Sequence, residues 1–215
     1  MNRPEQLRQE YESSQRATHY RDDRWTRSAR ARNTNAKELA IVDSFASRCR
    51  TESQVEHFPH AIDLPCGTGR FHSLLQSHCQ ELWSIDASFE MLAASPCSPQ
   101  VQASAHALPF VSNAADFVLC SRLLHHFETC PERLAVLQEL ARVSKRWVVL
   151  SYFDSACLQA WRNRLRAKFR GRFPISRTTF SQEVQAAGLA ERQRRYIQRG
   201  FSEQVWVLLE CRSRG

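Results

Sequence analysis

Residues 62–71 read IDLPCGTGRF, and this stretch decides the fold. The apolar residues 61–64 predict a short buried strand, and the spacing of apolar residues over 71–79 predicts a helix. Between them lies a tight turn with Gly67 and Gly69, preceded by the acidic Asp63. Small residues in such a turn let a cofactor approach the backbone at the carboxyl end of the first strand. We therefore interpret the stretch as a strand–turn–helix unit that binds a cofactor.

A second short strand is predicted over residues 82–86 and ends in Asp86. A carboxylate at this position can accept hydrogen bonds from the two vicinal hydroxyls of a ribose. Two alternatives are an ordinary turn with a surface acid and a dinucleotide-binding fold. The second lacks support, because His72 and Ser73 stand where G-x-G-x-x-G places its third glycine.

The rest of the chain alternates strand and helix patterns. Further strands are predicted at 101–103, 115–120, 146–153, 194–198 and 204–210, and helices at 4–50, 89–94, 132–143 and 178–187, with a cap or break at 33–35. This order predicts an α/β fold with a doubly wound, seven-stranded, mostly parallel sheet and a C-terminal antiparallel hairpin. We expect residues 1–50 to form a helical cap over the cofactor site and residues 51–215 to form the binding domain.

Composition and charge narrow the protein class. The 215 residues carry a net charge of +8, and no apolar run approaches the roughly 20 residues of a membrane-spanning helix. The N-terminus has no apolar signal segment, so we expect a cytoplasmic protein. The eight cysteines contain no C-x-x-C pair. They predict small, buried, reduced side chains and no metal site.

At residues 61–150 the sequence resembles the class I S-adenosylmethionine-dependent methyltransferase family, in particular its small-molecule, type 11-like branch with the motif D-L-x-C-G-T-G. The resemblance implies S-adenosylmethionine as the cofactor. It implies that the turn at 67–69 packs against the methionine part and that Asp63 helps to hold the amino group. Asp86 would bind the ribose, with Ala87 and Met91 beside the adenosine.

Two further segments carry the resemblance. Residues 103–110, ASAHALPF, are similar to the family's G-D-A-x-x-L-P-F, with Ser104 in place of the aspartate that contacts adenine, so that contact should be weaker. Residues 116–127, DFVLCSRLLHHF, resemble D-x-V-x-x-x-x-x-L-H-H, in which Asp116 is structural. The cofactor-binding residues implied in all are Asp63, Pro65, Cys66, Gly67, Thr68, Gly69, Asp86, Ala87, Met91, Ser104, Ala105, Ser121 and Arg122.

Methyl transfer needs a base only when the acceptor must lose a proton. His125 and His126 are the candidate catalytic residues, because imidazole titrates closest to physiological pH. The alternative is that they only pack against or cap neighbouring structure. Tyr11, Tyr20 and Trp25 precede the sheet and could close the site over the cofactor or simply pack against the domain.

A basic segment at residues 155–177 predicts an inserted amphipathic helix. Its part 158–177 could contact an anionic small substrate, an anionic membrane surface or RNA phosphates, or be a plain solvated face.

The sequence favours a methyltransferase that modifies an O, N or C nucleophile of a small acceptor, which could be anionic or lipid-like. An RNA methyltransferase and a non-catalytic adaptor with the same fold are the alternatives. RNA is less favoured because the fourth strand carries no N/D-P-P-Y motif. The residues leave the acceptor, the methylated atom and the oligomeric state open.

Overall fold

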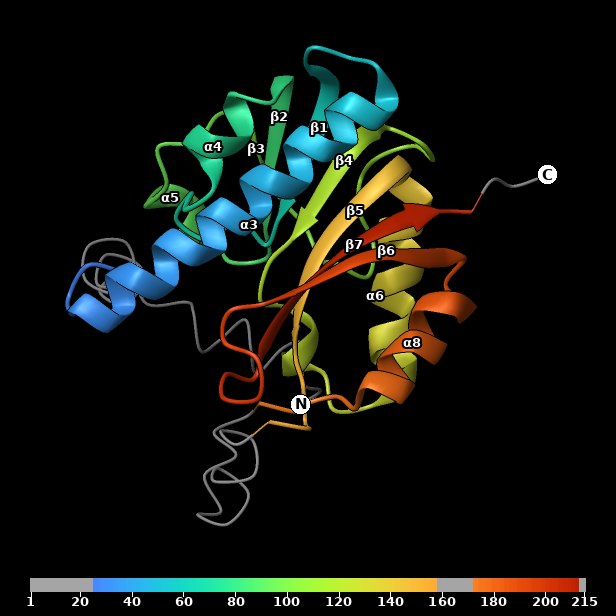
Figure 1. The fold of residues 1–215 in the computed structure, drawn as a ribbon. Coiled ribbons are helices and arrows are strands. Elements are labelled where there is room, and N and C mark those ends of the chain that lie inside the picture. Colours follow the sequence, from blue (N-terminus) through green and yellow to red (C-terminus); the bar gives the residue numbers. More distant parts are fainter. Residues whose placement is uncertain (1–24, 158–171, 213–215) are drawn as a thin grey trace.

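The computed structural model describes residues 25–157 and 172–212, and seven of its strands form one sheet (Figure 1). The strands are β1 (Phe58–Leu64), β2 (Cys79–Asp86), β3 (Gln100–Gln102), β4 (Ala115–Cys120), β5 (Ser144–Phe153), β6 (Leu189–Tyr196) and β7 (Gln204–Cys211). Their order is β3-β2-β1-β4-β5-β7-β6. All neighbours are parallel except β7, which runs antiparallel to both β5 and β6. The predicted fold class is confirmed.

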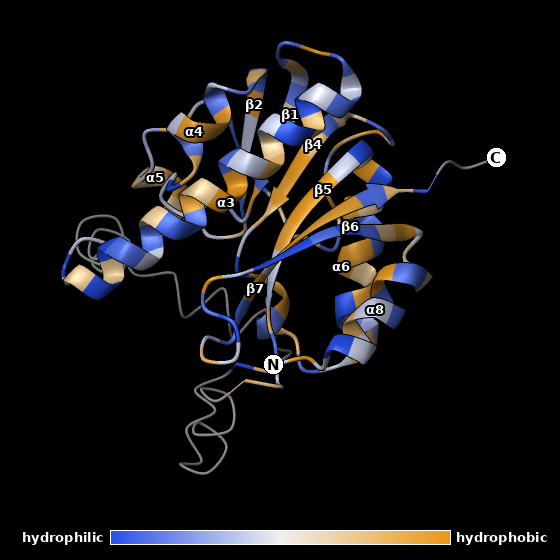
Figure 2. Ribbon diagram, in the orientation of Figure 1, coloured by the Kyte–Doolittle hydropathy of each residue, from blue (hydrophilic) through white to orange (hydrophobic). Residues whose placement is uncertain are grey.

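Helices cover both faces of this sheet. The helices α3 (Ala29–Ser53) and α4 (His72–Gln76) lie on one face, and α6 (Cys130–Val143) and α8 (Arg177–Ala186) lie on the other (Figure 1). Alternate residues of a strand point to opposite faces. Thus Phe117 of β4 packs in the cluster below α3, whereas Val118 packs in the cluster below α6. The central strands are therefore apolar on both faces, as Figure 2 shows.

The helix starts follow from short polar side chains. Ser28 caps α3, Ser176 caps α8, and Thr129 forms a capping box with Glu132 at the start of α6. In each case the hydroxyl oxygen accepts a hydrogen bond from a first-turn backbone amide, which would otherwise lack an intrahelical partner. Gly188 follows α8 with φ +78°, the left-handed conformation expected at a helix end.

Two sequence-based expectations about helices are wrong. No break occurs at residues 33–35, because α3 is one continuous helix over Ala29–Ser53. Its buried face, including Val42 and Phe45, packs on the sheet and outweighs the weak helix propensity of the asparagines. The helix after the glycine turn spans only His72–Gln76, because β2 already begins at Cys79.

The sheet order places a crevice at the centre of the fold. The chain leaves β1 to form β2 and β3 on one side and returns to form β4 on the other. Connections then diverge at the carboxyl ends of β1 and β4, where open α/β sheets bind ligands. The predicted boundary at residue 50 lies inside α3, and much of the predicted insertion, 158–171, lies outside the described residues.

Within residues 25–157 and 172–212, the structure contains no helix with the length and apolar character needed to cross a membrane.

Candidate functional site

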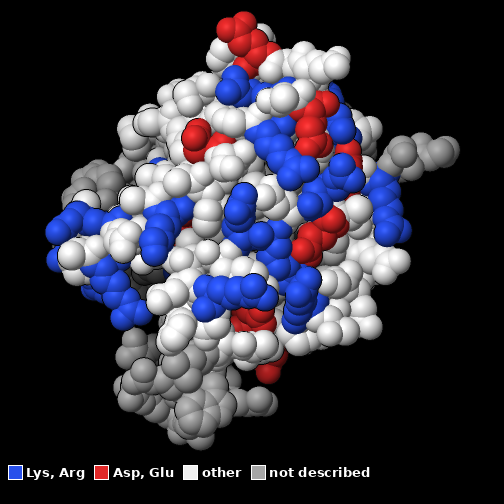
Figure 3. All heavy atoms as spheres, in the orientation of Figure 1, with Lys and Arg blue, Asp and Glu red and all other residues white. Residues whose placement is uncertain are grey.

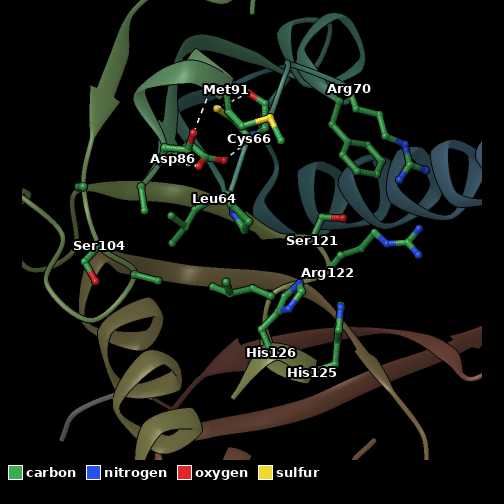
Figure 4. Close-up of a pocket in the computed structure, with 18 of the residues that line it drawn as sticks. Leu64, Cys66, Arg70, Asp86, Met91, Ser104, Ser121, Arg122, His125 and His126 are labelled. Carbon is green, nitrogen blue, oxygen red and sulfur yellow. Dashed lines mark hydrogen bonds between the residues drawn. The ribbon is translucent and has the colours of Figure 1, made fainter. Parts of the chain in front are cut away.

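A cavity of about 1250 Å³, its open mouth included, lies at the carboxyl ends of β1, β2 and β4 (Figure 4). Twelve of the predicted site residues line it: Pro65, Cys66, Gly67, Asp86, Ala87, Met91, Ser104, Ala105, Ser121, Arg122, His125 and His126. Three predicted residues, Asp63, Thr68 and Gly69, are absent from this lining. Predicted residues up to 61 positions apart in the sequence, from Pro65 to His126, are thus brought together around one space.

Asp86 stands at one end of the cavity and is fixed by backbone amides (Figure 4). Its Oδ2 accepts a hydrogen bond from Gly67 N at 2.8 Å, and its Oδ1 accepts one from Ser88 N at 2.9 Å. Burial raises the pKa of this carboxyl, whereas the amide donors of Ser88, Gly67 and Ala87 act in the opposite direction. These amides orient the carboxylate, and its roughly four acceptor sites leave capacity for a ligand.

The two glycines of the turn have different roles. Both have positive φ, +56° at Gly67 and +83° at Gly69. A Cβ on Gly67 would meet no atom within 4 Å, whereas a Cβ on Gly69 would lie 2.4 Å from Cys97 Sγ. Gly67 therefore leaves space at the cavity wall for a ligand, and Gly69 lets the turn pack against the loop after α5 (Phe89–Ala93).

Asp63 lies behind the cavity wall at the end of β1 and is 1% exposed. Neither of its carboxylate oxygens has a hydrogen-bond partner among the described residues. Burial raises the pKa of Asp63 to about 8, with a further contribution from Asp86, while Arg70 acts in the opposite direction. A cationic group beside this buried side chain would stabilise its ionised form, so the position suits a positively charged part of a ligand.

A buried ion-pair cluster forms the other end of the cavity. Glu38 of α3 is completely buried, and its Oε2 lies 2.6 Å from Arg70 Nη2, while its Oε1 accepts a hydrogen bond from Arg122 Nη1 at 3.3 Å. Arg122 has φ +59° and donates its backbone amide to Ser151 Oγ at 2.9 Å. A non-glycine residue held in this conformation is often found at a functional site. One carboxylate thus holds two guanidinium groups at the cavity.

Trp25 covers this cluster. The guanidinium carbon of Arg70 lies 3.6 Å from the Trp25 ring centroid, and that of Arg122 lies 5.2 Å away. The ring also lines the cavity. Trp25 therefore packs at the site, whereas Tyr11 and Tyr20 lie outside the described residues.

The two histidines lie on the turn after β4, in the 3₁₀ helix η1 (Leu124–His126). His125 is 3% exposed, and its ring is stacked on Phe153 at 3.7 Å between centroids and 5° between planes. His126 is half-buried and also lines the cavity (Figure 4). The stacking on Phe153 is what the packing alternative expects of His125, and His126 is the more exposed of the two.

Ser104 lies at the Asp86 end of the cavity, on the loop after β3. Its hydroxyl oxygen accepts a hydrogen bond from His106 N at 3.3 Å. The hydroxyl is thus partly used within its own loop.

Sequence reasoning missed Glu38 entirely and gave Arg70 no role. Arg70 directly follows the glycine turn in the sequence, so its position could have indicated a role at the site. Glu38 carried no such indication, because its partners lie 32 and 84 residues away in the sequence.

The cysteines behave largely as expected. None of the eight, all of which lie in the described residues, forms a disulfide; six are buried, whereas Cys130 is exposed and Cys211 is half-buried. In the part of the chain that the structure describes, no group of three or more His, Cys, Asp or Glu side chains is arranged to hold a metal ion.

The comparisons with known proteins agree with this geometry. Residues 62–150 match the family model for a methyltransferase domain. No curated protein sequence matches the chain. Among solved structures, similar folds include magnesium protoporphyrin IX methyltransferase from Synechocystis PCC 6803 with bound SAH, at 13% identity over 98% of this chain and 100% of that one, with a TM-score of 0.76.

Two further structures show the same fold. One is the N-methyltransferase NodS of Bradyrhizobium japonicum WM9 in complex with S-adenosylhomocysteine, at 15% identity, 94% and 97% coverage and a TM-score of 0.65. The other is an S-adenosylmethionine-dependent methyltransferase from Clostridium acetobutylicum, at 12% identity, 80% and 91% coverage and a TM-score of 0.64. At these identities the likeness concerns the fold.

Proposed function

Because residues 62–150 form the domain of an S-adenosylmethionine-dependent methyltransferase, we propose that the protein methylates an O, N or C nucleophile of a small-molecule acceptor. The observation that carries this proposal is the cavity itself. A fixed carboxylate, Asp86, stands at one end, and a pair of arginines held by Glu38 stands at the other. These groups suit a ligand with a ribose at one end and an amino acid at the other.

The residues fit the cofactor at four points. Asp86 would accept hydrogen bonds from the ribose hydroxyls, and the open space beside Gly67 would admit the cofactor close to the backbone. Asp63, which is buried and has no hydrogen-bond partner among the described residues, would act behind the wall toward the amino group. Arg70 and Arg122 would bind the carboxylate by charge-assisted hydrogen bonds. Ala87, Met91, Ser104, Ala105, Pro65, Cys66 and Ser121 would form the remaining wall.

When bound, S-adenosylmethionine supplies a methyl group on a sulfonium leaving group. The protein's own residues then have to orient the acceptor and exclude water. We propose that Trp25 and the first turns of α3 cover the cofactor, and that Thr68 and Gly69 shape the turn. His126 would accept a proton from the acceptor, and His125, stacked on Phe153, would hold the turn in place.

The charge distribution supports a small acceptor more than RNA. Figure 3 shows acidic side chains interleaved with the basic ones on the face around α3 and β6. Ion pairs of exposed arginines include Arg146 with Glu210 at 2.8 Å and, on α3, Arg48 with Glu52 at 2.6 Å. Such pairs reduce the phosphate-binding potential of a surface.

Calorimetric titration with S-adenosylmethionine tests the proposal. We expect micromolar binding and its loss in Asp86→Ala. Asp116→Ala is the matched control, because Asp116 lies on β4, where it contacts His60 N and Lys145. Absence of binding by the wild-type protein would favour the non-catalytic adaptor.

A further inference from the structure

A third arginine, Arg172, lines the same cavity as Arg70 and Arg122. It belongs to a different segment of the chain, between β5 and α8. Its side chain is 42% exposed, so its guanidinium is accessible from the cavity mouth. Three cationic side chains therefore line the cavity, whereas Asp86 is the single carboxylate among the described lining residues.

Backbone contacts fix the position of Arg172. The next residue, Phe173, donates its amide to His125 O at 2.7 Å. The guanidinium carbon of Arg172 lies 5.7 Å from the Phe153 ring centroid, and the same ring is stacked on His125. The Arg172 segment is thus attached to the turn that carries both histidines, and Arg172 and His126 line the same cavity.

The three arginines do not all share one counter-ion. Glu38 serves both Arg70 and Arg122, as described above. Arg172 instead faces Glu203, with 3.9 Å between Nη1 and Oε1, and Glu203 is nearly buried. Arg172 thus faces a different carboxylate from the pair that we assign to the cofactor.

We propose that Arg172 binds an acidic group of the acceptor, and that the acceptor is a small anion with an apolar or aromatic body. The inference rests on the proposed function, because it assigns Arg70 and Arg122 to the cofactor. The apolar body is indicated by Leu123 and Phe127, which line the cavity next to the two histidines. An acid anchored at Arg172 places the rest of the acceptor against His126.

The test uses protein saturated with S-adenosylhomocysteine, so that the cofactor site is filled. Two probes of equal shape, 2-naphthoate and its neutral analogue 2-naphthamide, are titrated by calorimetry. We expect the carboxylate to bind at least about tenfold more tightly than the amide, because a charge-assisted contact adds to the shared apolar contacts. Arg172→Gln should remove this preference and Arg172→Lys should retain part of it.

The matched control is Arg195→Gln, because Arg195 is an exposed arginine on β6 outside the cavity lining. It should retain the full preference for naphthoate. If naphthoate has no advantage, or if its advantage survives in Arg172→Gln, the anionic acceptor is wrong while the proposed function stands. If S-adenosylhomocysteine itself fails to bind the wild-type protein, both proposals are wrong.

Discussion

The two ends of the cavity are built in different ways. At the Asp86 end, the carboxylate is held by the amides of Gly67 and Ser88, so the geometry comes from two strand-to-helix turns. At the arginine end, Glu38, Arg70 and Arg122 come from three distant segments and depend on one buried carboxylate. The first end relies on backbone shape, and the second relies on charge balance in a buried space.

This difference determines how each end responds to substitution. A carboxylate held by amides can be removed with a local loss of hydrogen bonds. A carboxylate that neutralises two partly buried guanidinium groups cannot, because its removal leaves like charges together. We therefore expect the arginine end to carry more of the folding stability and the Asp86 end to carry more of the ligand specificity.

The largest expected effect is on Glu38. Glu38→Gln should lower the free energy of unfolding by about 3 kcal/mol, because Arg70 and Arg122 lose their shared counter-ion. Denaturant unfolding measures it. Asp43→Asn on the same helix is the control, because the Asp43 carboxylate is 57% exposed and pairs with His78. This variant should lower the free energy of unfolding by less than about 1 kcal/mol. An equal decrease in the free energy of unfolding of the two variants would show that neutralisation of Arg70 and Arg122 by Glu38 does not stabilise the fold.

A smaller effect separates the two glycines of the turn. Gly69→Ala should destabilise the protein by about 2 kcal/mol, since its Cβ would lie 2.4 Å from Cys97 Sγ and 2.8 Å from Ser95 Oγ. Gly67→Ala should cost about 1 kcal/mol, from its positive φ alone. It should nevertheless weaken S-adenosylhomocysteine binding, because the new methyl group occupies the open space at the wall. The reverse order in stability would contradict the roles assigned to the glycines.

The pH dependence of the free energy of unfolding tests the environment of Asp63. Its pKa is raised from 3.8 to about 8 in the folded protein, so the folded state binds a proton that the unfolded state loses between these values. Stability from this group is therefore complete below about pH 4 and is lost as the pH rises toward 8. Between pH 5 and 7, the free energy of unfolding of the wild type should fall by about 1.4 kcal/mol per pH unit because of Asp63. Asp63→Asn should lack this part of the decrease.

Unfolding titrations at several pH values measure this difference. Parallel pH curves for wild type and variant would mean that Asp63 is ionised in the folded protein, against the burial argument.

The sequence predicted what neighbouring residues determine together. The strand–turn–helix at residues 62–71, the sheet topology and the inward position of Asp86 all follow from local patterns, since strand ends and glycine turns are set within a few residues. The continuous α3 was not predictable from its asparagines, because burial of Val42 and Phe45 against the sheet decides it. Glu38 was not assigned to the site, and Arg172 was predicted only as part of the basic segment 158–177, since the positions of both depend on packing between distant segments.

The central claim is that the two ends of the cavity bind the two ends of S-adenosylmethionine. It is tested most directly by titrating Asp86→Asn and Arg70→Gln with S-adenosylhomocysteine and with 5′-methylthioadenosine, which lacks the amino-acid end. Asp86→Asn should weaken both ligands at least tenfold, and Arg70→Gln should weaken the first about tenfold while leaving the second unchanged. Equal losses for both ligands in Arg70→Gln, or unchanged binding in Asp86→Asn, would contradict the account.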